Sequence, residues 1–454
     1  MKPIKPLLLA FAVMAITTIA PCAQSSGITL TTLVSFKAAY GSHPQAGLVL
    51  GTDGNFYGTT ELGGTNSLNF GTVFRMTPAG ALTTLISFNN TNGSQPFAEL
   101  VQAPSGKLYG TTSQGGTNGG FGTVFQITSN GAFTTLFSFN RTNGSFPEAA
   151  LAMGTNGNLY GTTSQGGTNG GFGTVFQITT NGQLTTLFSF NNTNGSTPLS
   201  GLLPGTNGTF YGTTSAGGAN GLGTLFQINT NGQLTNWVAF NGANGANPYA
   251  GLIMGTDGNF YGTTYNGGSA NLGTIFRMTP VGIFTNLISF NNLNGANPFA
   301  QLLQGTDGNF YGTTELGGAT GDGTAFQMSP QGVFSTLISF DYFSTGNLPV
   351  GALVQGADGN LYGTTHNGGS INGTVFSFPI TPSFQHFART NNSVTFIWST
   401  VPGKSYQVQS TLGLNQTNWN NLGLPIFATN TTATASDTVS GGNSNRFYRV
   451  MRLP

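Results

Sequence analysis

Charged residues are scarce in this chain: lysine, arginine, aspartate and glutamate make up 5% of its 454 residues. Twelve basic residues face eleven acidic ones, and two of the basic residues, Lys2 and Lys5, fall in the leader described below. A surface this close to neutral lacks the positive charge that neutralises phosphates in nucleic-acid binding. It also lacks the charge that draws proteins to anionic membranes. We therefore expect no nucleic-acid partner.

Cysteine is almost absent, since Cys22 is the only one. It follows a basic start and an apolar run over residues 7–20, which together predict a secretory signal peptide over residues 1–23. The order Ile19-Ala20-Pro21-Cys22 loosely resembles a lipobox, so lipidation of Cys22 is the alternative to simple cleavage, although Pro21 stands where a small residue is expected. Either way we expect an extracellular or cell-surface protein whose folded part has no disulfide.

Long apolar runs and recognisable catalytic motifs are missing too. No segment after the leader approaches the roughly 18 apolar residues that suggest a membrane span, and the C-terminus carries no apolar tail. His43 and His386 are isolated in the sequence, and no zinc-protease, serine-hydrolase or phosphate-loop motif occurs. The Asp-Gly turns carry one acidic residue each, too few for a calcium loop. We expect no metal, no cofactor and no catalytic residue.

What the chain does have is a repeat. The tetrapeptide Tyr-Gly-Thr-Thr occurs seven times at intervals of 50–52 residues, beginning at Tyr57, Tyr109, Tyr160, Tyr211, Tyr261, Tyr311 and Tyr362. A fixed period of this length is typical of stacked or radial repeat architectures. The 37 phenylalanines and 13 tyrosines at regular spacing also supply more apolar anchors than a disordered chain carries.

Each repeat contains four β-prone segments, which we call A, B, C and D, separated by turn-forming residues. An unpaired D segment, Ile28–Phe36, precedes the first repeat, and the last repeat stops after its C segment. The N-terminal segment would therefore complete the last unit and close a ring. The sequence predicts a seven-bladed β-propeller over residues 28–380, with an open β-solenoid as the alternative.

Beyond about residue 382 the period disappears. Short alternating segments separated by glycine turns predict a small immunoglobulin-like or fibronectin-III-like β-sandwich over residues 384–454. We expect Trp398, Tyr406 and Phe447 in its core. The alternative is that Trp398 or Trp419 stacks on carbohydrate.

The unit Gly-Thr-Asp-Gly-Asn-Phe-Tyr-Gly-Thr-Thr, followed by Gly-Gly and Gly-Thr-Val-Phe, resembles the Gloeobacter/Verrucomicrobia (GloVer) tandem repeat. The resemblance recurs seven times over about 350 residues and implies a secreted bacterial protein, but no particular activity. The pattern Tyr-Gln-Val-Gln-Ser, Asn-Trp and Arg-Phe-Tyr-Arg-Val is similar to fibronectin-III-like C-terminal domains of secreted Verrucomicrobia and Planctomycetes proteins.

The long D-to-A and B-to-C loops of a propeller share one face, and function concentrates on long loops held by a rigid scaffold. The residue after each Tyr-Gly-Thr-Thr lies on this face, in the order Glu61, Ser113, Ser164, Ser215, Tyr265, Glu315 and His366. The non-serine residues belong to neighbouring units of a closed ring. We hypothesise that Glu315, His366 and Glu61 form one polar cluster that binds a ligand or a cation, and that Tyr265 is a further ligand-binding residue. The alternative is a set of solvated loop charges.

These features favour a non-catalytic binding or interaction protein, which we expect to be a monomer. Neutral amide and hydroxyl loops suit carbohydrate or another cell-envelope component as the partner. One alternative is a polysaccharide lyase or glycoside hydrolase, with Glu61 and Glu315 as the carboxylate pair and His366 as a base. The other is a purely structural or adhesive spacer.

Overall fold

Strands are the only regular secondary structure in the part of the chain that the structure describes. This computed structural model describes residues 28–65, 69–369, 371–382, 384–390, 393–412, 418–438 and 446–453. The predicted signal peptide and Cys22 lie outside the described residues. Within them, no helix is long and apolar enough to cross a membrane.

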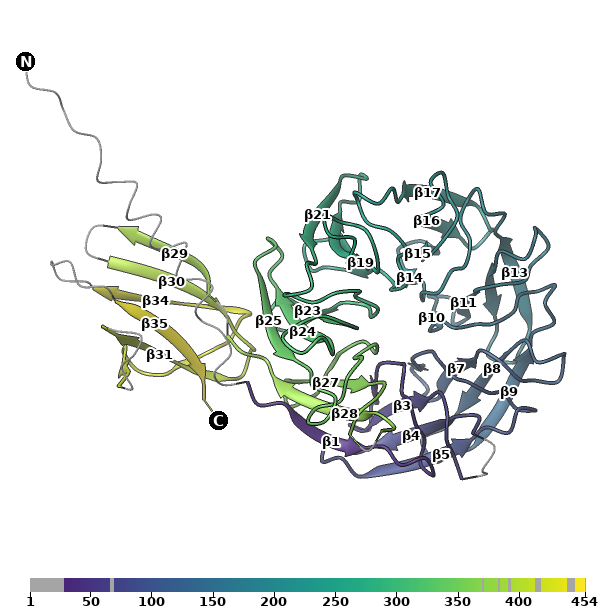
Figure 1. The fold of residues 1–454 in the computed structure, drawn as a ribbon, viewed down its shortest axis with the longest axis horizontal. Helices are drawn as coiled ribbons and strands as arrows, with labels where there is room; N and C mark the ends of the chain where they lie inside the picture. Colours follow the sequence, from purple (N-terminus) through teal and green to yellow (C-terminus); the bar gives the residue numbers. More distant parts are fainter. Residues whose placement is uncertain are drawn as a thin grey trace, which may run out of the picture.

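Seven four-stranded antiparallel sheets follow one another along the chain, one for each repeat, and we number them in that order. Figure 1 shows them around a ring, with β10 and β14 toward the middle and β13 and β17 at the periphery. The first four sheets contain β2 (Val49–Leu50), β3 (Phe56–Thr60), β4 (Thr72–Met76) and β5 (Leu82–Ser87); β6 (Val101–Gln102), β7 (Leu108–Thr112), β8 (Thr123–Ile127) and β9 (Phe133–Ser138); β10 (Ala152–Met153), β11 (Leu159–Thr163), β12 (Thr174–Ile178) and β13 (Leu184–Ser189); β14 (Leu203–Pro204), β15 (Thr209–Thr214), β16 (Thr224–Asn229) and β17 (Leu234–Ala239).

The remaining three sheets complete this propeller-like arrangement. They contain β18 (Ile253–Met254), β19 (Phe260–Thr264), β20 (Thr274–Met278) and β21 (Phe284–Ser289); β22 (Leu303–Gln304), β23 (Phe310–Thr314), β24 (Thr324–Met328) and β25 (Phe334–Ser339); β26 (Val354–Gln355), β27 (Asn360–Thr365), β28 (Thr374–Pro379) and, from the other end of the chain, β1 (Thr31–Ser35).

The strand β1 joins the two ends of the repeat region. It pairs antiparallel with β28, with Thr32 opposite Phe376 and Ser35 opposite Thr374, and so becomes the outer strand of sheet 7. The predicted pairing of the N-terminal segment with the last repeat is therefore confirmed. An outer edge that would otherwise be open is covered in this way.

The innermost strands are only two residues long. In the second repeat the A segment runs from Pro96 to Gln102 in the sequence, but only Val101–Gln102 pairs within its own sheet. The backbone oxygen of Ala98 instead accepts a hydrogen bond from Thr59 of the preceding sheet at 3.2 Å. Near the ring axis, the inner segment therefore bonds to the neighbouring sheet.

Apolar side chains fill the space between each pair of adjacent sheets. One such cluster, made of Phe36, Phe56, Phe74, Tyr362, Val375 and their neighbours, lies between sheets 7 and 1. The glycine of each Tyr-Gly-Thr-Thr makes room for this packing: a Cβ on Gly58 would lie 2.6 Å from the ring of Phe74. A side chain there would displace the phenylalanine that fills the interface.

Two further sheets form a C-terminal unit, defined here as the described residues from 384 to 453. One contains β29 (Phe384–Thr390), β30 (Ser393–Ser399) and β34 (Thr432–Thr438), and the other contains β31 (Ser405–Thr411), β32 (Asn420–Asn421), β33 (Ile426–Phe427) and β35 (Phe447–Arg452). Both contribute to one core that includes Trp398 and Tyr406, as predicted. Phe447 was predicted there too, but its neighbour Tyr448 packs against this core, and Phe447 is only partly buried. Trp419 lies under the Arg449 guanidinium at 4.4 Å.

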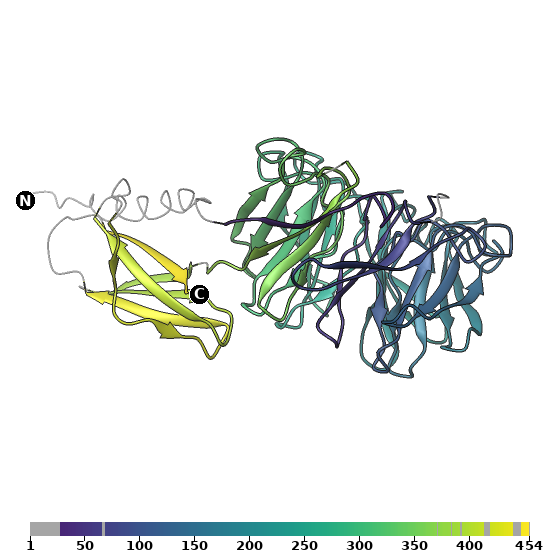
Figure 2. The same ribbon diagram turned by 90° about the horizontal axis from the view of Figure 1, so that it is seen from below.

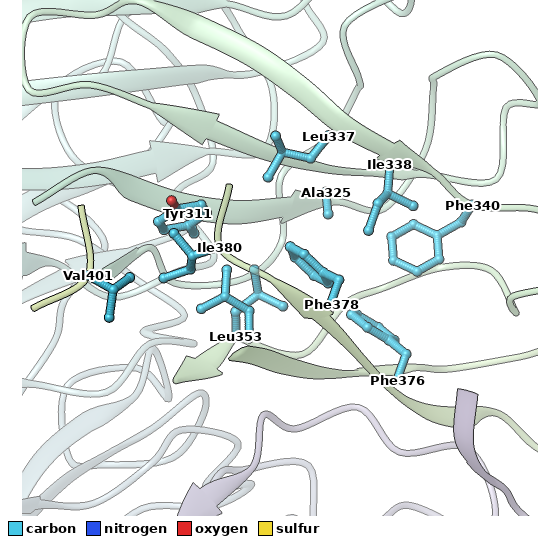
Figure 3. Packing of buried hydrophobic residues seen from close by; sticks show 11 residues of the cluster. Tyr311, Ala325, Leu337, Ile338, Phe340, Leu353, Phe376, Phe378, Ile380 and Val401 are labelled. Atoms are coloured by element: carbon cyan, nitrogen blue, oxygen red, sulfur yellow. The ribbon is translucent and has the colours of Figure 1, made fainter. Parts of the chain in front are cut away.

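The C-terminal unit contacts sheets 6 and 7, and both ribbon views place it beside the ring (Figures 1 and 2). Val401 packs with Ile380 and Tyr311 in the cluster between those sheets (Figure 3). The Nη2 atom of Arg452 donates to the backbone oxygen of Asp358 at 3.2 Å. The unit is thus attached to the ring by packing as well as by the connecting chain.

Candidate functional site

The long D-to-A loops and the ends of the B strands meet on one face, which we call the long-loop face. In every repeat, a residue of the D-to-A loop forms a β-bridge with the second residue after Tyr-Gly-Thr-Thr: Ser42 with Leu62, Ser94 with Gln114, Ser145 with Gln165, Ser196 with Ala216, Ala246 with Asn266, Ala296 with Leu316, and Asn347 with Asn367. The loops are therefore fixed to the scaffold at the point where the predicted site residues emerge.

The residue before the loop proline adopts a left-handed backbone conformation in all seven repeats. Its φ lies between 53° and 56° at His43, Gln95, Phe146, Thr197, Asn247, Asn297 and Leu348. For a residue with a side chain, this conformation is about 1–2 kcal/mol less favourable than the right-handed one, a cost that glycine avoids. None of the seven is glycine, and six different side chains occur. The long-loop face therefore carries varied side chains at a position where backbone energetics favour glycine.

His366 and Glu61 meet across the junction of sheets 7 and 1. The Nε2 atom of His366 lies 3.4 Å from Oε2 of Glu61, and the two side chains are 22% and 17% exposed. Gln45 donates from Nε2 to the same carboxylate oxygen at 2.7 Å. The ring of His43 lies 4.9 Å from that of His366. Residues from the first and last repeats thus form one group, which we call the His366–Glu61 cluster.

The electrostatics of this cluster favour a charged carboxylate and a neutral His43. Burial on its own would raise the pKa of Glu61, but hydrogen bonds from His366 and Gln45 and the charges of both histidines outweigh it, so the pKa is lowered. The pKa of His43 is lowered by burial and by repulsion from His366, against a smaller opposing effect of Glu61.

Tyr265 and Glu315 form a second group across sheets 5 and 6. The hydroxyl of Tyr265 donates to Oε2 of Glu315 at 2.8 Å. The ring of Tyr249 lies 4.7 Å from that of Tyr265 and 5.4 Å from that of Phe299. Burial, followed by the hydrogen bond and charge of Glu315, raises the pKa of Tyr265. We call these four residues the aromatic cluster.

The four predicted site residues are therefore brought together in pairs. His366 contacts Glu61, and Tyr265 contacts Glu315. Among the described residues, no hydrogen bond or ion pair joins Glu315 to His366. In place of the single cluster of Glu315, His366 and Glu61 that we hypothesised, the structure shows two separate contacts. Whether either of them binds a ligand stays a prediction.

The opposite arc of the ring carries small hydroxyl residues around one carboxylate. The hydroxyl of Ser113 donates to Oε1 of Glu148 at 3.4 Å. Burial raises the pKa of Glu148, against hydrogen bonds from Ser113 and Ser164. The long-loop face is therefore divided into an arc of serines and an arc of aromatic and ionisable residues.

Glu99 lies near the ring axis. Its counterparts include Gly47, Gly251 and Ala352, and a Cβ on Gly47 would lie 2.7 Å from the backbone oxygen of Ala352. These positions are thus adjacent around the centre of the ring. The Glu99 carboxylate has no hydrogen bond or ion pair within the described residues, and burial raises its pKa to about 7.

Five residues of these groups were not predicted from the sequence: His43, Gln45, Tyr249, Phe299 and Glu99. They lie before or after the loop proline and not after Tyr-Gly-Thr-Thr, where the repeats were compared. Alignment on that proline finds three of them, since the following residue is Gln45, Phe97, Glu148, Leu199, Tyr249, Phe299 or Val350. His43 stands in the column before the proline, and Glu99 in the third column after it.

The turn aspartates have a structural role. Oδ2 of Asp53 accepts a hydrogen bond from the Tyr57 hydroxyl at 2.7 Å, and Oδ1 accepts one from the backbone N–H of Asn55 at 3.1 Å. Asp257, Asp307 and Asp358 make the same contacts in their repeats. Within the described part of the chain, no group of three or more His, Cys, Asp or Glu side chains could hold a metal ion.

A family profile for the Gloeobacter/Verrucomicrobia repeat matches residues 18–226 and 203–400. These two spans cover most of the chain, which therefore belongs to the Gloeobacter/Verrucomicrobia repeat family. No curated protein matches the sequence.

Solved structures share the all-β architecture at low sequence identity. An extracellular domain from B. thetaiotaomicron aligns over 95% of this chain with 12% identity and a TM-score of 0.51, and this chain spans 57% of its length. The BP39L lectin from Burkholderia pseudomallei aligns over 84% of this chain and 98% of its own, with 11% identity and a TM-score of 0.49. A gluconolactonase from Xanthomonas campestris aligns over 79% of this chain and 92% of its own, with 11% identity and a TM-score of 0.41. At these identities the likeness concerns the fold alone.

Proposed function

We propose that this member of the family is a secreted or cell-surface, non-catalytic binding protein that recognises carbohydrate through its long-loop face. The scaffold would be a seven-bladed β-propeller over residues 28–380, followed by a fibronectin-III-like sandwich over residues 384–454. Residues 1–23 would be the signal peptide, with Cys22 as the less favoured anchoring site. The mature protein would act as a monomer.

The aromatic cluster is the observation that carries this proposal. Tyr249, Tyr265 and Phe299 present partly exposed rings, and Glu315 supplies a hydrogen-bond acceptor among them. Binding sites for polar organic ligands combine apolar surface with a few fixed polar groups. A sugar ring offers C–H groups to aromatic faces and hydroxyls to a carboxylate. The near-neutral charge of the chain also suits an uncharged ligand.

Catalysis is the less supported alternative. A glycoside hydrolase uses two carboxylates that flank the scissile bond, one of them as an acid with a raised pKa. Glu61 has a lowered pKa and accepts hydrogen bonds from Gln45 and His366. Glu315 accepts the hydroxyl of Tyr265. Both carboxylates are thus occupied by protein donors. A spacer with no specific ligand is the other alternative.

A glycan array followed by polysaccharide pull-down tests the proposal. We expect retention on at least one neutral glycan and no release of reducing ends during long incubation. Tyr249→Ala and Phe299→Ala should weaken retention at least tenfold, whereas Val281→Ala, at an exposed residue of a C-to-D turn, should leave it unchanged. Cleavage of a polysaccharide that disappears in Glu61→Gln or Glu315→Gln would establish an enzyme instead. Absence of binding to every glycan and envelope fraction would leave the spacer.

A further inference from the structure

Two hollows of about 540 and 530 Å³ lie on the outer part of the long-loop face, one on sheet 3 and one on sheet 2. Each is lined by the loop that enters the sheet, by its B-to-C loop and by its outer strand. The nine residues that line one hollow are identical to those that line the other, at a constant offset of 51 positions. Sites of this volume are typical of small-molecule pockets.

A reciprocal pair of asparagines shapes the wall of each hollow. On sheet 2, the backbone N–H of Asn89 donates to Oδ1 of Asn92 at 2.9 Å, and the N–H of Asn92 donates to Oδ1 of Asn89 at 3.0 Å. Asn140 and Asn143 repeat this arrangement on sheet 3 at 3.1 Å in both directions. Because the Oδ1 atoms are held by backbone donors, the side-chain NH₂ groups are fixed in orientation.

These NH₂ groups remain available to a ligand. Within the described residues, none of the four asparagines donates a side-chain hydrogen bond. The B-to-C loop offers an acceptor, because Asn118 donates from Nδ2 to the backbone oxygen of Ser138 at 2.8 Å and keeps its Oδ1 free of protein donors in the described part of the chain. The lining of each hollow therefore combines donors of fixed orientation with an acceptor.

The outer strand adds apolar surface. Phe137 is partly buried, and its ring packs edge-to-face on Phe139 at 5.4 Å, while Phe188 packs in the same way on Phe190 at 5.3 Å. No lining residue is charged. The hollows thus combine fixed amides, threonine hydroxyls and an aromatic side chain without an ionisable group, a combination that fits a neutral, hydroxyl-rich ring.

We propose that these two hollows are equivalent carbohydrate subsites, each binding one sugar unit of a neutral polysaccharide. This inference rests on the proposed function and adds two binding sites, on sheets 2 and 3, to the one at the aromatic cluster. Two equal sites on adjacent sheets bind one polymer jointly, so the second contact becomes intramolecular. Retention on a polysaccharide should therefore exceed the affinity for a short oligosaccharide by about 100-fold.

The test uses the full chain with cello-, chito-, laminari- and manno-oligosaccharides in isothermal titration, and with the matching insoluble polysaccharides in pull-down. Thr117→Arg and Thr168→Arg place a long side chain into each hollow from an exposed loop position. Thr155→Arg makes the same change at an exposed residue of an A-to-B turn, on the other face. Thermal unfolding checks that all variants are folded.

We expect three oligosaccharides per wild-type chain, two in the hollows and one at the aromatic cluster. Either single variant should bind two per chain, and the double variant should bind only the one at the aromatic cluster. Polysaccharide retention should fall at least tenfold in each single variant, and Thr155→Arg should match wild type. A wild-type stoichiometry of one would overturn the subsites without using any variant. If the double variant binds normally and Tyr249→Ala does not, the subsites are wrong while the proposed function stands. No binding of any glycan by wild type would remove both.

Discussion

The side-chain hydroxyl of Thr364 donates a hydrogen bond of 2.9 Å to the backbone oxygen of Ala46, which lies 318 residues earlier in the chain. This contact ties the last repeat to the first. Equivalent threonines bridge to the next inner segment elsewhere in the ring, from Thr59 to Ala98, Thr111 to Ala149, Thr162 to Ser200, Thr213 to Ala250 and Thr263 to Ala300. The seventh, Thr313, is buried with no partner for its hydroxyl in the described part of the chain.

This difference between equivalent threonines predicts opposite effects of the same substitution. Thr364→Val leaves the Ala46 oxygen without its donor and should lower the free energy of unfolding by about 1–3 kcal/mol. Thr313→Val removes a hydroxyl that gains nothing from burial, and should leave stability unchanged or raise it slightly. Urea unfolding followed by tryptophan fluorescence measures both. Equal losses in the two variants would show that the Thr364 bond does not stabilise the closed ring.

Closure of the ring also predicts the cost of truncating Phe36. This residue is 1% exposed and packs edge-to-face on Phe74 at 5.3 Å, across the junction of sheets 7 and 1. Phe190 makes the same contact with Phe226 at 5.4 Å, between sheets 3 and 4. Phe36→Ala and Phe190→Ala should each lower the free energy of unfolding by about 3–5 kcal/mol, as measured by urea unfolding. A much smaller loss at Phe36 than at Phe190 would mean that the terminal junction is open in solution.

Much of the fold could be predicted because the sequence repeats. The period located each sheet, and the unpaired segment before the first repeat predicted the pairing of β1 with β28, which is observed. The short inner strands could not be anticipated from the same pattern. Ala98 and its equivalents lie in an apolar run that is typical of a strand. Near the axis, however, their backbone oxygens accept hydrogen bonds from threonine hydroxyls of the neighbouring sheet.

The candidate site was less predictable, because it depends on which loops of different repeats meet. Comparison of the repeats singled out His366 and Glu61 as exceptions, and they are in contact. It could not show that Gln45 and His43 complete that cluster, because both belong to a loop whose backbone turns at a left-handed residue before proline. A left-handed conformation at His43 is unexpected from sequence, since residues before proline favour extended conformations.

The His366–Glu61 cluster predicts two opposite shifts in the titration of His43. Its pKa is lowered by burial and by the charge of His366, while Glu61 acts in the other direction. His366→Ala should therefore raise the pKa of His43, and Glu61→Gln should lower it further. Proton NMR of the chain's three histidines follows both changes, with the resonance lost in His43→Gln giving the assignment. An unchanged His43 titration in both variants would rule out the electrostatic coupling.

Glu99 predicts an unusual dependence of stability on pH. Its pKa is about 7 in the folded protein and 4.5 as an ordinary value, so between these two the folded state retains a proton that the unfolded chain has released. The contribution of Glu99 to stability is therefore most favourable below about pH 4.5, and it falls by at most about 3 kcal/mol as the pH rises to about 7. Glu99→Gln carries no such group. It should match wild type near pH 4 and be more stable at pH 8, as measured by urea unfolding across this range.

Glu61→Gln is the control of opposite sign, because the lowered pKa of Glu61 gives stability that is present at neutral pH and is lost on acidification. A constant difference between Glu99→Gln and wild type at every pH would show that the carboxylate is hydrated at the ring axis.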